Sequence, residues 1–96
     1  MNLLTVVATI ITKKEYVKEV GINLAKLLLP TRSEAGCVNY DLHQSIDNPE
    51  IYIFYENWKS EAQLDAHLKS KHITTCMNKI DHMLEKVDVH KLKNLN

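Results

Sequence analysis

Apolar and polar residues alternate along several short stretches of the chain, a pattern typical of β-strands. Leu3 to Thr12 is rich in the β-branched residues Val, Ile and Thr, which suit strands. Cys37 to Ser45 and Ile51 to Trp58 also alternate, and the turn-forming residues Asp47 to Glu50 lie between them. These two stretches are therefore predicted to form a β-hairpin. Val87 to Leu92 is predicted to be a short final strand.

The alternation assigns the side chains of the hairpin to two opposite faces, because successive residues of a strand point in opposite directions. In the first strand one face carries Val38, Tyr40 and Leu42, and the other face carries Asn39, Asp41 and His43. In the second strand one face carries Tyr52, Phe54, Glu56 and Trp58, and the other carries Ile51, Ile53 and Tyr55.

The stretches between the strands have helical spacing of apolar residues. Thr12-Lys13-Lys14-Glu15 has the form of a capping box and is predicted to begin a helix, which should end or kink at Pro30. Ser60-Glu61-Ala62-Gln63 is a second capping box, and Leu64, His67 and Leu68 follow it on one stripe. Apolar spacing from Ile73 to Val87 predicts a further amphipathic helix.

The predicted order is strand, helix, strand, strand, helix, strand. This order is that of an α+β fold of the ferredoxin-like split βαβ type, an antiparallel four-stranded sheet with its helices on one face. Residues 1–96 form a single domain. Leu3 to Ile11 and Ile51 to Trp58 carry large apolar side chains on both faces, although the helices of one chain can cover only one. A second copy is expected to cover the other, which predicts a homodimer.

Composition and charge narrow the function. Lys and Arg number twelve, as do Asp and Glu, so the chain lacks the electrostatic field typical of nucleic-acid or membrane binding. Cys37 and Cys76 are too few for a disulfide framework and fit reduced thiols in a cytoplasmic protein. Only two glycines are present, so no glycine-rich phosphate loop exists, and we expect no nucleotide or flavin cofactor.

Polar and aromatic side chains point into an otherwise apolar layer. If the faces of hairpin and helices coincide, they enclose a small-molecule cavity; the six residues are Asn39, His43, Glu56, Trp58, His67 and His72. Each also has a plain interpretation: a core aromatic for Trp58, a solvated carboxylate for Glu56, and a satisfied core, helix-capping or surface histidine for the others. His67 and His72 lie five residues apart across a helix break, unlike a facing metal-binding pair, so we expect no metal.

Three motifs resemble one known family. They are Glu34-Ala35-Gly36-Cys37-Val38-Asn39-Tyr40, then Tyr55-Glu56-Asn57-Trp58-Lys59-Ser60-Glu61, then Leu64-Asp65-Ala66-His67-Leu68 followed by His72. In this order they are similar to the antibiotic biosynthesis monooxygenase domain over nearly the whole chain.

The resemblance implies a dimeric α/β barrel, with a pocket in each subunit between sheet and helices. It also implies a monooxygenase that oxidises a small quinol or related phenolic aromatic with molecular oxygen, without metal, flavin or haem. The implied proton-transfer residues are His67, His72 and His43, with Glu56 orienting a histidine. Asn39 would hold an oxyanion, and Trp58 would line the ring site.

Departures from the family pattern limit the substrate. Phe54 and Leu64 replace an Asn and a Tyr that the polyketide-oxidising branch places near the tryptophan, so these two residues would shape a smaller substrate site. Met77 stands where the haem-degrading branch has its iron-binding histidine, which disfavours haem degradation. Two alternatives stay open: an isomerase of a small ketose-like signal molecule, and a non-catalytic small-molecule-binding or stress-associated dimer.

Overall fold

The computed structural model of the protein describes residues 3–96, so Met1 and Asn2 of the predicted domain lie outside the described part. The elements follow in the order β1 (Leu4–Thr12), the 3-10 helix η1 (Lys14–Tyr16), α1 (Val17–Ala25), α2 (Leu28–Arg32), β2 (Cys37–Gln44), β3 (Ile51–Trp58), α3 (Glu61–Leu68), α4 (Lys71–Ile80), the 3-10 helix η2 (Asp81–Met83) and β4 (Leu84–Leu92).

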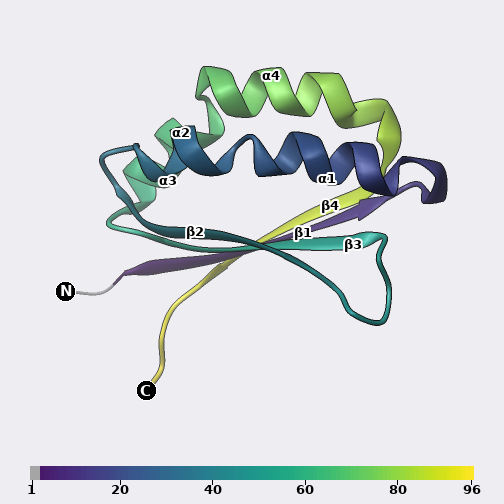
Figure 1. The fold of residues 1–96 in the computed structure, drawn as a ribbon. Coiled ribbons are helices and arrows are strands. Elements are labelled where there is room, and N and C mark those ends of the chain that lie inside the picture. The colour runs from purple at the N-terminus through teal and green to yellow at the C-terminus, as the bar shows by residue number, and fades with distance from the viewer. Residues whose placement is uncertain (1–2) are drawn as a thin grey trace.

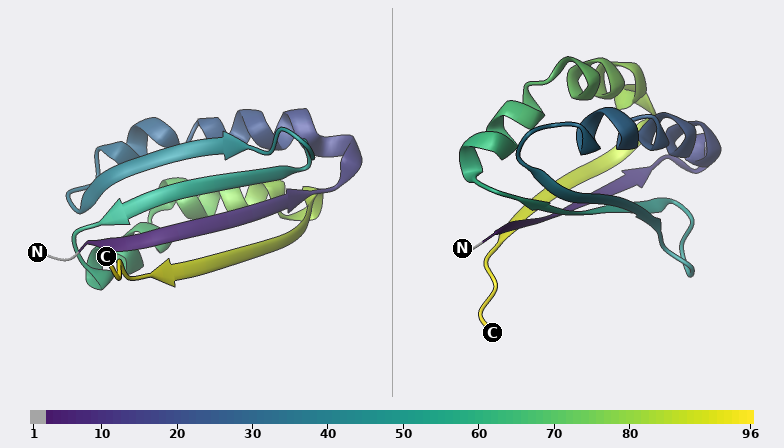
Figure 2. Two further views of the ribbon diagram at one scale, coloured as in Figure 1. Left: turned by 90° about the horizontal axis from the view of Figure 1, so that it is seen from below. Right: turned by 60° about the vertical axis from the view of Figure 1, so that its left-hand side comes forward.

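The four strands form one antiparallel sheet in the order β2-β3-β1-β4, and the helices all lie on one of its faces (Figure 1). Figure 2 shows the opposite face, on which no helix lies. This architecture confirms the ferredoxin-like α+β prediction. None of the helices of residues 3–96 is long and apolar enough to cross a membrane.

The core lies between the sheet and the helices. Alternate residues of β1 and β3 are buried against α1 and α3, including Val6, Phe54 and Trp58. From the helices, Leu24 and Leu64 are almost wholly buried. The hairpin faces follow the predicted alternation, because burial on one face makes a one-residue slip costly.

A β-bulge interrupts the pairing of β2 with β3. Cys37 lies opposite Trp58 and Asn39 lies opposite Asn57, so Val38 is the extra residue between them. Because of the bulge, both Cys37 and Tyr40 can face the helices.

The predicted helix boundaries need three corrections. The box at Thr12 caps no helix: Thr12 is fully buried at the end of β1, and α1 begins only at Val17. Pro30 interrupts nothing, since the break at residues 26–27 precedes it and Pro30 sits in the first turn of α2, where no intrahelical N–H is needed.

The third correction is that α4 ends at Ile80 rather than continuing to Val87. Strand pairing causes the early end: the backbone N–H of Lys13 donates to the carbonyl of Met83 at 2.8 Å, and Leu84 pairs with Thr12. Pairing of β4 along β1 thus overrides the helical spacing of residues 83–87. By contrast, the Ser60 box is confirmed, with the Gln63 N–H donating to Ser60 Oγ at 3.2 Å.

Candidate active site

Two residues of β3 place a carboxyl group beside the only tryptophan of the chain. Glu56 and Trp58 lie on the same strand face and are 4% and 0% exposed. The indole Nε1–H of Trp58 donates to Glu56 Oε1 at 2.8 Å. A buried carboxylate normally requires such a partner. This hydrogen bond fixes the orientation of Glu56 within the apolar layer.

Glu34 joins the two predicted histidines. Its Oε2 lies 2.7 Å from Nδ1 of His67, on α3, and 2.8 Å from Nε2 of His72, on α4. Glu34 itself lies in the connection between α2 and β2, so three separate segments meet at one carboxylate oxygen. The His67 side chain is almost completely buried and His72 is a quarter exposed. The three residues form a path from the interior toward solvent.

Aromatic rings surround His67. Its ring centroid lies 4.6 Å from that of Trp58 and 5.4 Å from that of Tyr40. Tyr40 in turn stacks on Phe54 at 4.6 Å. Since Nδ1 of His67 is engaged by Glu34, Nε2 is the ring nitrogen left for a ligand.

Burial moves the pKa values of Glu56 and His67 in opposite directions. Loss of solvation raises the pKa of the Glu56 carboxyl to about 7, against a lowering by the Trp58 hydrogen bond, and Glu34 adds a further increase. For His67, loss of solvation lowers the pKa, although the hydrogen bond and charge of Glu34 oppose this. Near neutral pH the site thus holds an acid and a base side by side.

A small apolar cavity of about 110 Å³ lies next to these groups, between sheet and helices. Glu56, His67 and Tyr40 are its polar or partly polar wall residues, and the rest of the wall is aliphatic or aromatic. Three of the lining residues are between 42% and 46% exposed and mark its mouth: Leu68, Val87 and Val89. The arrangement is a dry chamber with a few convergent polar groups, which is typical of small-molecule sites.

The structure brings together most of the predicted residues but not all. Glu56, His67, Phe54 and Leu64 line the cavity. Trp58 packs behind His67, and His72 reaches the site through Glu34.

The prediction that Asn39 and His43 enclose the same cavity is wrong. Asn39 pairs with Asn57 and His43 with Ile53, on the sheet face away from the helices. Asn39 is engaged there in hydrogen bonds with Asn57 and Asp41. Alternation had put Asn39 and His43 on one face of β2, but the helix-facing residues of β2 are Tyr40 and Leu42, which lie opposite Glu56 and Phe54.

Sequence reasoning missed the role of Glu34. The residue stands at the start of the first family-like motif, and this position is the one signal that pointed to it. Its distance in sequence from His67 and His72, thirty-three and thirty-eight residues, hides the contact.

The same three residues are the group that could hold a metal ion within residues 3–96. Their ligand atoms all lie within 4.8 Å of one another. However, Glu34 Oε2 already accepts or shares a hydrogen bond with each ring, and a cation would have to displace both. The observed geometry therefore favours proton sharing.

Comparison with known proteins places this site in a family. The family model described as "Antibiotic biosynthesis monooxygenase" matches residues 3–79. The chain belongs to the antibiotic biosynthesis monooxygenase family. The resemblance found in its motifs is thereby confirmed.

Two curated proteins are similar to this member of the antibiotic biosynthesis monooxygenase family. Protein sll1783 of Synechocystis is 32% identical over 82 residues, which cover 84% of this chain and 56% of that protein. Rv0793 of Mycobacterium tuberculosis is 43% identical over 49 residues, which cover 51% of this chain and 48% of that protein. The chain thus matches about half the length of these relatives.

Solved structures match over the full fold. PA3566 of Pseudomonas aeruginosa has a TM-score of 0.95 at 29% identity, covering 100% of this chain and 97% of that one. A structure titled as an antibiotic biosynthesis monooxygenase has a TM-score of 0.91 at 28% identity, covering 97% and 99%. The family name and these titles point to oxidoreductase chemistry.

Proposed function

We propose that the protein is a cofactor-independent monooxygenase that oxidises a small quinol or related phenolic aromatic with molecular oxygen. The observation that carries this proposal is the pairing of His67 and Glu56, with oppositely shifted pKa values, on the wall of one apolar cavity. Pairs of titratable groups with divergent pKa values are typical of acid–base catalysis.

The size of the cavity supports a substrate with one ring. An engineered apolar cavity of about 150 Å³ binds benzene, and the volume here is about 110 Å³. Phe54 and Leu64, both in the wall, supply apolar contacts. A polycyclic phenol would require the mouth at Leu68, Val87 and Val89 to widen.

In the proposed reaction, neutral His67 accepts the phenolic proton at Nε2. Glu34 stabilises the imidazolium through Nδ1, as an acidic partner does for a catalytic histidine. The electron-rich phenolate passes one electron to oxygen, and the two radicals combine to form a carbon–oxygen bond. Protonated Glu56 gives a proton to the resulting peroxide, water leaves, and the carbon becomes a quinone carbonyl. One oxygen atom enters the product and the other leaves as water.

The experiment is oxygen uptake with a panel of single-ring hydroquinones, with product identified by incorporation of labelled oxygen. We expect turnover that survives chelators, and a loss of about 10²-fold or more in kcat for His67→Ala. His43→Ala is the matched control, because His43 is exposed on the other face of the sheet and should keep full activity.

Three other outcomes would contradict the proposal. Full turnover by His67→Ala would remove that residue from the mechanism. Solvent deuterium entering a ketose-like product without oxygen consumption would favour the isomerase alternative. Tight binding of the hydroquinones without turnover in the wild type would favour the non-catalytic binder.

The proposal includes a homodimer in the cytoplasm. The helix-free sheet face carries Val7, Ile11 and Ile53, which are only half-buried, and Tyr55, which is 44% exposed. A second copy packed on this face would remove these side chains from water, which is favourable by about 25 cal/mol for each Å² of apolar area. Cys37 and Cys76 are free thiols, which suits a reducing compartment.

A further inference from the structure

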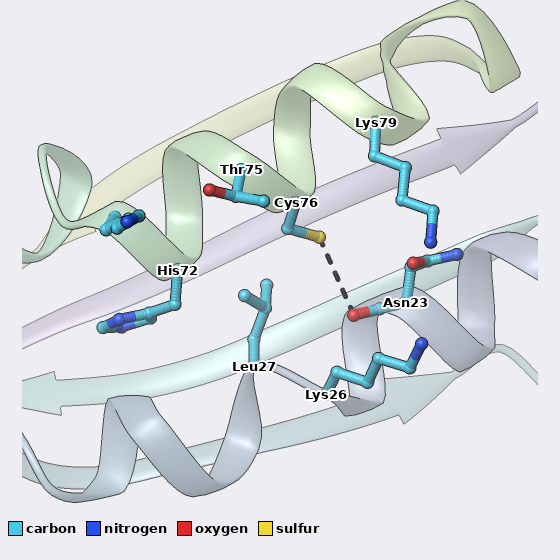
Figure 3. Close-up of a pocket in the computed structure, with 8 residues that line it drawn as sticks. Asn23, Lys26, Leu27, His72, Thr75, Cys76 and Lys79 are labelled. Carbon is cyan, nitrogen blue, oxygen red and sulfur yellow. Dashed lines mark hydrogen bonds between the residues drawn. The ribbon is translucent and has the colours of Figure 1, made fainter.

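A second and larger hollow, of about 490 Å³, lies between α1 and α4 on the helical side of the molecule. Asn23, Lys26 and Leu27 line it from α1 and the turn that follows, and the other wall belongs to α4 (Figure 3). It adjoins the inner cavity, since Leu27 lines both. The proposed oxygenase reaction makes no use of this hollow.

Three ammonium groups converge on the hollow. Lys26 extends from the end of α1, and Lys71 and Lys79 extend from α4. In Figure 3 the side chains of Lys26 and Lys79 reach from opposite helices toward Asn23, which lies between them. No aspartate or glutamate belongs to the lining. The chain as a whole is neutral, so this excess of positive charge is local.

The three lysines are unpaired within residues 3–96. The ion pairs of that part of the chain involve other cations, namely Arg32, Lys86, Lys91 and the two histidines of Glu34. No hydrogen bond from Lys26, Lys71 or Lys79 to these residues is present either. Three like charges around one hollow repel each other, and a bound anion would relieve that repulsion.

The floor of the hollow is apolar and rigid. Leu27 is 4% exposed and Cys76 is 9% exposed, and the thiol of Cys76 donates to the backbone carbonyl of Asn23 at 3.7 Å, which ties α4 to α1. Thr75 adds a hydroxyl group one helical turn from Lys71 and Lys79. Cationic walls over an apolar floor suit a small organic molecule that carries an anionic group.

We propose that this hollow binds a small molecule through a phosphate-like dianion, held by Lys26, Lys71 and Lys79. Lysine ammonium groups bind phosphates as point charges and need no fixed bidentate geometry. His72 lines the other end of the hollow and also contacts Glu34 (Figure 3). A dianion there therefore lies beside the path that leads to His67.

The test is isothermal titration of the full chain with inorganic phosphate and with phenyl phosphate, without any turnover. We expect binding that weakens as ionic strength rises. Lys26→Gln and Lys79→Gln should each weaken it about two- to fivefold, and the double variant about tenfold or more. Lys59→Gln, an exposed lysine outside the lining, is the charge-matched control and should bind as the wild type does.

Tighter binding of phenyl phosphate than of phosphate would assign the site to an organic ester, and equal binding would assign it to the free ion. Equal losses in Lys59→Gln and in the lining variants would overturn the proposal, because only net charge would then matter. Absence of binding by both probes at low ionic strength would also overturn it. All three exposed lysines can be replaced without touching the core, and the result is independent of oxygen chemistry at His67.

Discussion

The buried carboxyl of Glu56 should make the stability of the protein depend on pH in one defined window. Its pKa is about 7 in the folded state, against an ordinary value of 4.5. The ionised form is therefore disfavoured in the folded protein. The resulting contribution to stability is fully present below pH 4.5 and is lost as pH rises through about 7.

The magnitude follows from the difference between these two pKa values. At about 1.4 kcal/mol for each pH unit, it corresponds to a loss of at most about 3 kcal/mol in the free energy of unfolding by pH 8. Glu56→Gln removes the titration, while its amide oxygen can still accept the Trp58 hydrogen bond. We therefore expect the variant to gain on the wild type by up to about 3 kcal/mol as pH rises from 4.5 to 8.

The assay is urea unfolding, followed by circular dichroism at several pH values, for the wild type, Glu56→Gln and the exposed control Glu15→Gln. Other titrating groups are shared by all three proteins, so the difference between variant and wild type isolates Glu56. A difference that stays flat from pH 4.5 to 8 would refute the argument. The same result would remove Glu56 as an acid near neutral pH.

Three further changes test other parts of the structure. Glu34→Gln should lower kcat about ten- to hundredfold with little change in KM, because a neutral amide no longer stabilises the His67 imidazolium; kinetics across pH measure this, and an unchanged kcat would argue against the relay. Gly21→Ala should destabilise the protein by about 1–3 kcal/mol in thermal unfolding, since a Cβ there meets the Tyr52 hydroxyl, which is held by Val17; wild-type stability would contradict this packing. Ile53→Asp, at the middle of the helix-free face, should give a monomer by light scattering while Ile46→Asp, on an exposed turn, stays dimeric; a monomeric wild type at low micromolar concentration would reject the dimer.

The fold could be predicted from the sequence because its strands carry a strong alternating pattern. Burial of Phe54, Glu56 and Trp58 on one face follows directly from their spacing. Local rules failed where tertiary pairing competes with them. The Thr12 capping box was given up to the end of β1, and the apolar spacing beyond Ile80 was given up to β4.

The site was predictable only in part. His67 was assigned to the inner side from its place beside Leu64 on α3, and it is buried there. The contact of Glu34 with both histidines depends on how three segments pack, which no local spacing records. The choice of helix-facing residues in β2 likewise depends on the register with β3, so Asn39 and His43 could not be placed from their own strand.

The position of Trp58 has a practical consequence. It is the only tryptophan, it is fully buried, and it touches both the acid and the base of the proposed reaction. Its intrinsic fluorescence therefore originates from a single place in the molecule. Ligand entry, protonation of the neighbouring groups and unfolding can each be followed optically, without a dye or a label.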